Sequence, residues 1–143
     1  MTTQQIELVK KSWNMVTPIA QDAGELFYKF LFEAAPGIRH LFKSETKDQA
    51  RKLVAMISVV VSNLDQLDTI LDDVKQLARR HDHYGAKPDH YAVVGETLIK
   101  ILKAGLGSEF NRETEEAWTA AYSILSGAMI ANQKPVMTSV QIL

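Results

Sequence analysis

Three of the chain's four histidines lie close together in the sequence: His81, His83 and His90. Gly85 can end a helix in a left-handed turn, and Pro88 can open the next helix because its fixed φ suits a first helical turn. His81 would then lie near the end of one helix, and Tyr91 one turn into the next. A neutral imidazole there can bind a metal if its second nitrogen finds an acceptor. A histidine near a helix C-terminus is more often only a favourable charge at the negative end of the dipole.

The histidines alone do not decide between these two readings. His81 and His83 could chelate zinc, but side chains at positions i and i+2 of a helix do not face each other. A tetrahedral zinc site would also need carboxylates from elsewhere. The chain has no cysteine, which excludes a thiolate metal site, a disulfide scaffold and a cysteine nucleophile. Gly105-Leu106-Gly107 lacks the Lys-Ser/Thr of a phosphate loop and predicts a helix stop instead.

Two other polar side chains, Tyr28 and Gln49, accompany apolar stripes. Gln49 and Leu53 are four residues apart and share one helix face. That face continues with apolar residues: Met56, Ile57 and Val60. Gln49 is either the solvated start of this helix or a hydrogen-bond donor facing an apolar cavity. Tyr28 lies in an aromatic-rich helix, and most buried tyrosines simply pack the ring and satisfy the hydroxyl. Both interpretations remain open for each residue.

The elements that must position these residues are all helical, since no strand-like alternation persists. The predicted helices cover residues 3–16, 17–34, 36–42, 48–62, 68–82, 88–106 and 111–133. Thr2 with Gln5 predicts a capping box, and Thr17-Pro18 predicts an N-cap followed by a first-turn proline. Asn63 can close the helix before it in a left-handed conformation. Residues 43–47 are expected to form a polar loop.

Length and composition predict one domain over residues 1–143, and the helical periodicity makes it all-α, with a tail at about 135–143 that packs back or is loose. A net charge of −1 argues against a nucleic-acid partner held by a basic surface. The first residues lack a signal-peptide pattern, and the most apolar run, 54–61, is too short to span a bilayer. Together with the absence of cysteine, this leads us to expect a cytoplasmic protein without a membrane span.

Several short sequence words occur in a fixed order along nearly the whole chain. They are Leu26-Phe27-Tyr28, Pro36 through Phe42, Asp48-Gln49 with Leu53, Asn63-Leu64, Arg80-His81, Lys87-Pro88 with Tyr91, Val94-Gly95-Glu96, and Trp118 with Tyr122. In this order they resemble the globin family, in particular flavohaemoglobins and single-domain bacterial haemoglobins, including neuroglobin-like bacterial globins. The resemblance implies a globin fold, a three-over-three helical sandwich of six to eight helices, that binds haem b.

The same resemblance implies roles for individual residues. His81 would be the proximal ligand of the haem iron, and Phe42 the ring that packs on the haem. Tyr28, Gln49 and Leu53 would line the distal pocket, with Tyr28 and Gln49 as the catalytic donors. The other haem-contacting residues would be Arg80, Tyr84, Tyr91 (behind His81) and Val94.

The implied ligands are O₂, NO and CO. Bound O₂ draws negative charge from ferrous iron, so a hydroxyl and an amide donor favour it by roughly 1 kcal/mol each. Two such donors slow O₂ release by very roughly ten- to a hundredfold. This would suit nitric oxide dioxygenation, in which bound O₂ and NO give nitrate. The alternatives are an O₂ store or carrier without catalysis, and a haem-based or haem-free sensory module.

The sequence departs from the flavohaemoglobin pattern in two ways. Gln133 stands where those proteins carry a glutamate behind the proximal histidine, unless the alignment slips and Glu115 or Glu116 takes that part. No flavin or nicotinamide fingerprint follows the globin segment, so electrons would come from a separate reductase. His83 and His90 lie outside the pattern and are expected on the surface. We expect a monomer or a weak homodimer.

Overall fold

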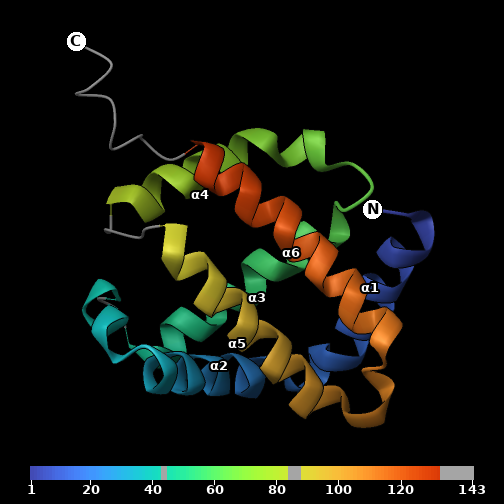
Figure 1. The fold of residues 1–143 in the computed structure, drawn as a ribbon, viewed down its shortest axis with the longest axis horizontal. Helices are drawn as coiled ribbons and strands as arrows, with labels where there is room; N and C mark the ends of the chain where they lie inside the picture. Colours follow the sequence, from blue (N-terminus) through green and yellow to red (C-terminus); the bar gives the residue numbers. More distant parts are fainter. Residues whose placement is uncertain (43–44, 84–87, 133–143) are drawn as a thin grey trace.

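The computed structural model describes residues 1–42, 45–83 and 88–132, without the side chains of residues 71, 81–83, 88 and 132. Within these ranges the chain forms α-helices joined by short 3₁₀ turns and contains no strand (Figure 1). The α-helices are α1 (Thr3–Val16), α2 (Ala20–Ala34), α3 (Thr46–Ser62), α4 (Leu71–His83), α5 (Pro88–Leu106) and α6 (Arg112–Asn132). The 3₁₀ turns are η1 (Thr17–Ile19), η2 (Pro36–Leu41), η3 (Leu67–Ile70) and η4 (Gly107–Glu109). The all-α prediction is confirmed.

The helices pack in two groups that share α5. Helix α2 packs against α3 and α5, whereas α6 packs against α1, α4 and α5. In Figure 1, α6 runs diagonally across the molecule, and α2 lies at the opposite side behind α5. Although α3 and α4 are consecutive along the chain, the described residues of these two helices share no extensive contact. Instead, α3 packs mainly against α2, and α4 packs mainly against α6.

The centre of the molecule is an apolar cluster around two tryptophans. The rings of Trp13 and Trp118 meet edge to face with centroids 6.0 Å apart. The indole Nε1 of Trp118 donates to Ser12 Oγ at 2.8 Å, and that hydroxyl donates to the Leu8 carbonyl at 2.6 Å. Ser12 is buried for this reason: a buried indole N–H requires an acceptor. The cluster fixes α6 against α1.

Most predicted helix ends agree with the structure. The capping box at Thr2 and Gln5 is present, with both hydrogen bonds at 3.0 Å. Helix α5 ends at Leu106. Gly107 follows with a left-handed φ of 56°, which interrupts a right-handed helix. Asn111 accepts from the Thr114 backbone N–H at 2.9 Å and starts α6.

Three local predictions are wrong. Thr17 does not cap α2, because its hydroxyl donates back to the Trp13 carbonyl at 2.9 Å and α2 begins only at Ala20. Helix α3 begins at Thr46, two residues earlier than predicted, since Asp48 in its first turn favours the positive helix end. Asn63 closes α3 through its amide, which donates to the Val59 carbonyl at 2.8 Å, with φ of −115° rather than a left-handed value.

Several predictions fall on residues outside the described ranges, namely the turn at Gly85, Tyr84, Gln133 and the tail 135–143. Among the helices described, none combines the length and the apolar character needed to cross a membrane.

Candidate functional site

The two polar candidates lie on α2 and α3, and these helices approach each other closely at Gly24 and Ala50. A Cβ on Gly24 would lie 3.0 Å from Ala50 Cβ and 3.2 Å from the Ala50 carbonyl oxygen, so a larger residue would require the two helices to shift by a few tenths of an ångström. Tyr28 lies one turn after Gly24 on α2, and Gln49 directly precedes Ala50 on α3. Gly24 was not predicted as a site-forming residue, although a glycine inside a helical pattern often marks a close packing contact.

Tyr28 lies in an aromatic group that joins α2 to the segment after η2. Its side chain is buried, and its ring meets Phe42 edge to face with centroids 5.4 Å apart. Phe32 completes the group at 5.9 Å from Tyr28 and 5.4 Å from Phe42. Leu53 of α3 and Val94 of α5 pack against the same cluster. The structure thus brings together four of the predicted site residues, from α2, α3, α5 and the end of η2.

The Tyr28 hydroxyl makes no hydrogen bond to any other described residue. Every fully enclosed side-chain N or O atom in the described part of the chain has a partner. The Tyr28 oxygen therefore borders accessible space, although the residue is only 6% exposed. Burial raises the pKa of Tyr28 to about 12, so the hydroxyl stays protonated at neutral pH. The half-buried Gln49 amide likewise makes no side-chain hydrogen bond within the described ranges. Both groups are free to donate.

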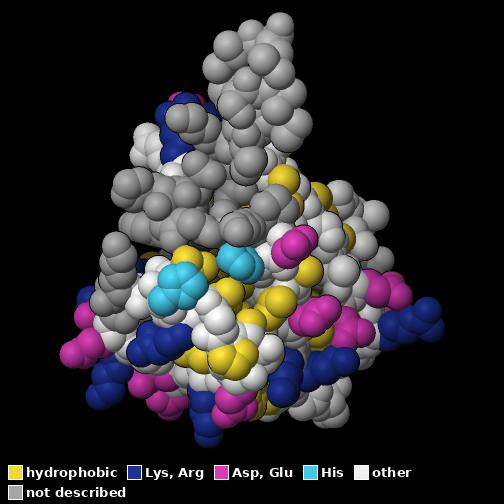
Figure 2. Space-filling view, turned by 60° about the vertical axis from the view of Figure 1, so that its left-hand side comes forward, with side chains coloured by type: hydrophobic (Ala, Val, Ile, Leu, Met, Phe, Trp, Pro, Cys, Tyr) yellow, Lys and Arg dark blue, Asp and Glu magenta, His cyan; other side chains and the backbone are white. Residues whose placement is uncertain are grey.

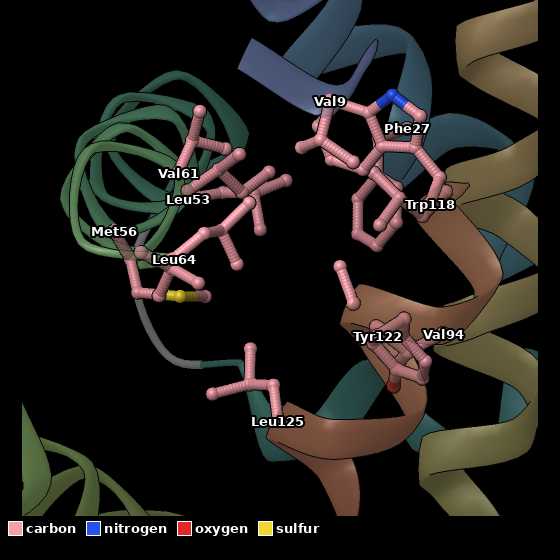
Figure 3. A pocket seen from close by; sticks show the side chains of 14 residues that line it. Val9, Phe27, Leu53, Met56, Val61, Leu64, Val94, Trp118, Tyr122 and Leu125 are labelled. Carbon is pink, nitrogen blue, oxygen red and sulfur yellow. The ribbon is translucent and has the colours of Figure 1, made fainter. Parts of the chain in front are cut away.

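An apolar cavity of about 70 Å³ lies beside this cluster (Figure 3). The α3 face predicted from the sequence forms one wall, with Leu53, Met56, Ile57 and Val60. Side chains from α5 and α6 form the opposite wall: Val94, Leu98, Trp118, Ala121, Tyr122 and Leu125. A water molecule occupies roughly 30 Å³ in the liquid, so a diatomic gas fits here. Neither Gln49 nor Tyr28 is part of the wall of this cavity.

Tyr91 lies on the other side of the site, against α4. It is buried together with Val74 and Ala78 of α4 and Met129 of α6. His81 follows Ala78 by three residues, which places its Cα on the same side of the helix as that buried face. The His81 side chain lies outside the description, so its role as an iron ligand stays a prediction. Arg80 next to it is exposed.

Tyr122 of α6 holds the first turn of α5. Its hydroxyl donates to the Tyr91 carbonyl oxygen at 2.6 Å. A Cβ on Gly95 would lie only 2.6 Å from Tyr122 Cε2, so the ring rests directly on the α5 backbone. Burial and the nearby Tyr91 both raise the pKa of Tyr122, which keeps the donor proton in place. Sequence periodicity indicated only that Tyr122 points inward.

The two acidic residues considered as substitutes behind Tyr91 lie elsewhere. Glu115 pairs with Lys103 at 2.6 Å, and Glu116 pairs with Arg112 at 3.1 Å. Both lie near the start of α6, whereas Tyr91 packs against Met129, more than three turns further along that helix. Both carboxylates are thus engaged in ion pairs near the start of α6, and the assignment of Gln133 stays a prediction that lies outside the described residues.

Figure 2 shows the face of the molecule on which η2 and the start of α5 lie. Histidine side chains lie there beside a group of hydrophobic side chains, and charged side chains surround them. The described histidines are His40 on η2, which is exposed, and His90 on α5, which is half-buried. Within the described ranges, no three His, Cys, Asp or Glu side chains gather into a metal-binding group. The zinc alternative concerns His81 and His83, whose side chains lie outside the description.

Comparison with known proteins shows which protein family shares this sequence and helical architecture. The sequence profile of the Globin family matches residues 25–129. A flavohemoprotein of Bacillus subtilis is 29% identical over 141 residues, which cover 94% of this chain and 34% of that protein. Neuroglobin-1 of Oncorhynchus mykiss is 29% identical over 143 residues, covering 90% of each chain. The chain thus spans about a third of the flavohemoprotein but most of the neuroglobin.

Solved structures of other proteins share the fold of this chain. A bacterial globin from Campylobacter jejuni superimposes with a TM-score of 0.83 at 27% identity, covering 92% of this chain and 96% of that one. An engineered carbene transferase, a putative nitric oxide dioxygenase from Rhodothermus marinus, gives a TM-score of 0.87 at 22% identity, covering 99% of both chains. Because its sequence identity is low, the likeness to the Rhodothermus marinus protein shows only that the two proteins share a fold. The chain belongs to the globin family, a family of haem proteins that bind small gaseous ligands.

Proposed function

We propose that this globin holds one haem b between α3 and α4 and binds O₂ on it reversibly. Haem supplies an iron that binds diatomic gases and exchanges single electrons. Among the described residues, α3 and α4 share no extensive contact. In this proposal His81 would ligate the iron, the Phe42 ring would pack against the porphyrin, and Leu53 and Val94 would exclude water from the bound gas. Arg80, Tyr84 and Tyr91 complete the contacts.

The observation that carries the proposal is the free Tyr28 hydroxyl. Because the Tyr28 oxygen borders accessible space, its hydroxyl can donate to a ligand that enters that space. Tyr28 is 6% exposed, its hydroxyl is protonated, and no described residue accepts from it. A bound ligand with a negatively charged outer atom would satisfy it. Gln49 offers a second donor without a partner among the described residues, so the donor set fits O₂ better than CO.

We further propose nitric oxide dioxygenation as the reaction. The overall change is NO + O₂ + e⁻ → NO₃⁻, so a reductase must return one electron in each cycle. The contribution of this chain is to retain O₂ until NO arrives, through donation from Tyr28 and Gln49. Its apolar cavity admits NO and keeps water away from the reacting atoms.

The test is to mix the O₂-loaded protein with one equivalent of NO and to measure nitrate. The proposal expects nitrate in equal amount to NO, and O₂ release that is slow compared with this reaction. Tyr28→Phe provides the matched control, because it should release O₂ faster while keeping the ring contacts with Phe42. Rapid O₂ release from the wild type without nitrate formation would instead identify an O₂ carrier.

A further inference from the structure

Tyr122 lies between two separate spaces in the molecule. On one side is the apolar cavity of about 70 Å³ beside the candidate site. On the other side is a groove of about 580 Å³ between α5 and α6. Tyr122 is part of the lining of both. Figure 3 shows its ring at the edge of the inner cavity, next to Val94 and Leu125.

Helix geometry explains this dual position. The α5 residues of the groove are spaced along one helix face: Ala92, Gly95, Glu96 and Ile99. The α6 residues of the groove also follow one face: Thr119, Ser123, Ser126 and Ile130. The adjacent faces carry the inner wall, with Val94 on α5 and Leu125 on α6. Half of the groove side chains are small, and the groove extends inward as far as Tyr122, which is part of its lining.

Two contacts hold the Tyr122 ring in this position. Its hydroxyl donates to the Tyr91 carbonyl at 2.6 Å, and its ring edge rests on Gly95, which has no side chain to confine it. The other polar group at the inner wall, the Trp118 indole, is occupied by Ser12. The inner cavity therefore presents apolar walls, and one hydrogen bond restrains the ring that closes it.

We propose that Tyr122 is a gate through which small apolar gases pass between the α5–α6 groove and the inner cavity. The gate opens when the hydroxyl leaves the Tyr91 carbonyl and the ring turns over Gly95. The physiological part of this proposal rests on the proposed function, since O₂ and NO are the gases concerned. The gate itself is a property of the protein wall and does not require haem.

Xenon tests the gate without haem chemistry, because apolar cavities take up xenon. The exchange rate of xenon between solvent and protein can be measured by ¹²⁹Xe NMR on wild type, Tyr122→Phe, Tyr122→Ala and Leu125→Ala. Leu125→Ala is the matched control: it also removes a large α6 side chain from the cavity wall, but it leaves the boundary with the groove intact. Circular dichroism confirms that each variant is folded.

Tyr122→Phe should exchange xenon about fivefold faster, since it loses one hydrogen bond of ordinary strength. Tyr122→Ala should be faster still, and Leu125→Ala should hold more xenon with little change in rate. CO association after flash photolysis of the haem-loaded variants should follow the same order. Unchanged xenon exchange in both Tyr122 variants, or an equal rise in Leu125→Ala, would overturn the gate. A protein that takes up no haem would refute the proposed function and leave the xenon result valid.

Discussion

Replacing Tyr28 by phenylalanine isolates the donor that the proposal assigns to bound O₂. The aromatic contacts to Phe27 and Phe42 involve only the ring and should persist. One hydrogen bond to a partly charged acceptor in an apolar site contributes roughly 1–2 kcal/mol. Its loss should speed O₂ dissociation about tenfold. CO carries less charge on its outer atom, so its dissociation should change much less.

Stopped-flow O₂ and CO dissociation on wild type and Tyr28→Phe would measure this contrast. Because the hydroxyl has no partner among the described residues, the mutation should leave the free energy of unfolding within about 0.5 kcal/mol of wild type. Equal acceleration of both ligands would show that Tyr28 acts through its bulk. No change for either ligand would make Tyr28 an ordinary core tyrosine and remove the main support for NO dioxygenation.

Three further predictions follow from other contacts. Gly24→Ala places a Cβ against the α3 backbone, so it should lower the free energy of unfolding in urea by about 1–3 kcal/mol and also speed O₂ release. An unchanged free energy of unfolding together with an unchanged O₂ release rate would show that α2 and α3 separate freely. Ser12→Ala leaves the Trp118 indole N–H unpaired and should lower the free energy of unfolding by about 1–3 kcal/mol, whereas an unchanged value would mean that water replaces the hydroxyl. Gln133 offers no carboxylate, so resonance Raman of the ferrous protein should give an iron–histidine stretch typical of a neutral imidazole. A peroxidase-like frequency would mean that another acid supports the histidine.

Most of the helices could be predicted from the sequence because the interactions that begin and end them join residues close together in the chain. The Thr2–Gln5 capping box and the glycine stop at Gly107 depend on residues within a few positions of each other. Thr17 was mispredicted because its hydroxyl had two local options, and the carbonyl of Trp13 accepted it. Propensity alone does not rank such competing hydrogen bonds.

The contacts that organise the site join residues far apart in the sequence. Gly24 meets Ala50, and Tyr122 donates to Tyr91 across thirty-one positions. Helical periodicity shows which face is apolar but not which face it meets. For Tyr28, the periodic pattern indicated burial and left open whether the hydroxyl had a partner. The structure supplies that missing fact, on which the proposed function depends.

The most direct test of the central claim is the haem content of three purified proteins: wild type, His81→Ala and His83→Ala. Absorption spectra and the pyridine haemochrome would report the amount and type of haem. His81 shares the helical register of Val74 and Ala78, which are buried on α4, whereas His83 does not. The account predicts a Soret band and haem b in wild type and His83→Ala, with a folded but haem-poor His81→Ala. Absence of haem from the wild type, or its loss only in His83→Ala, would contradict the account.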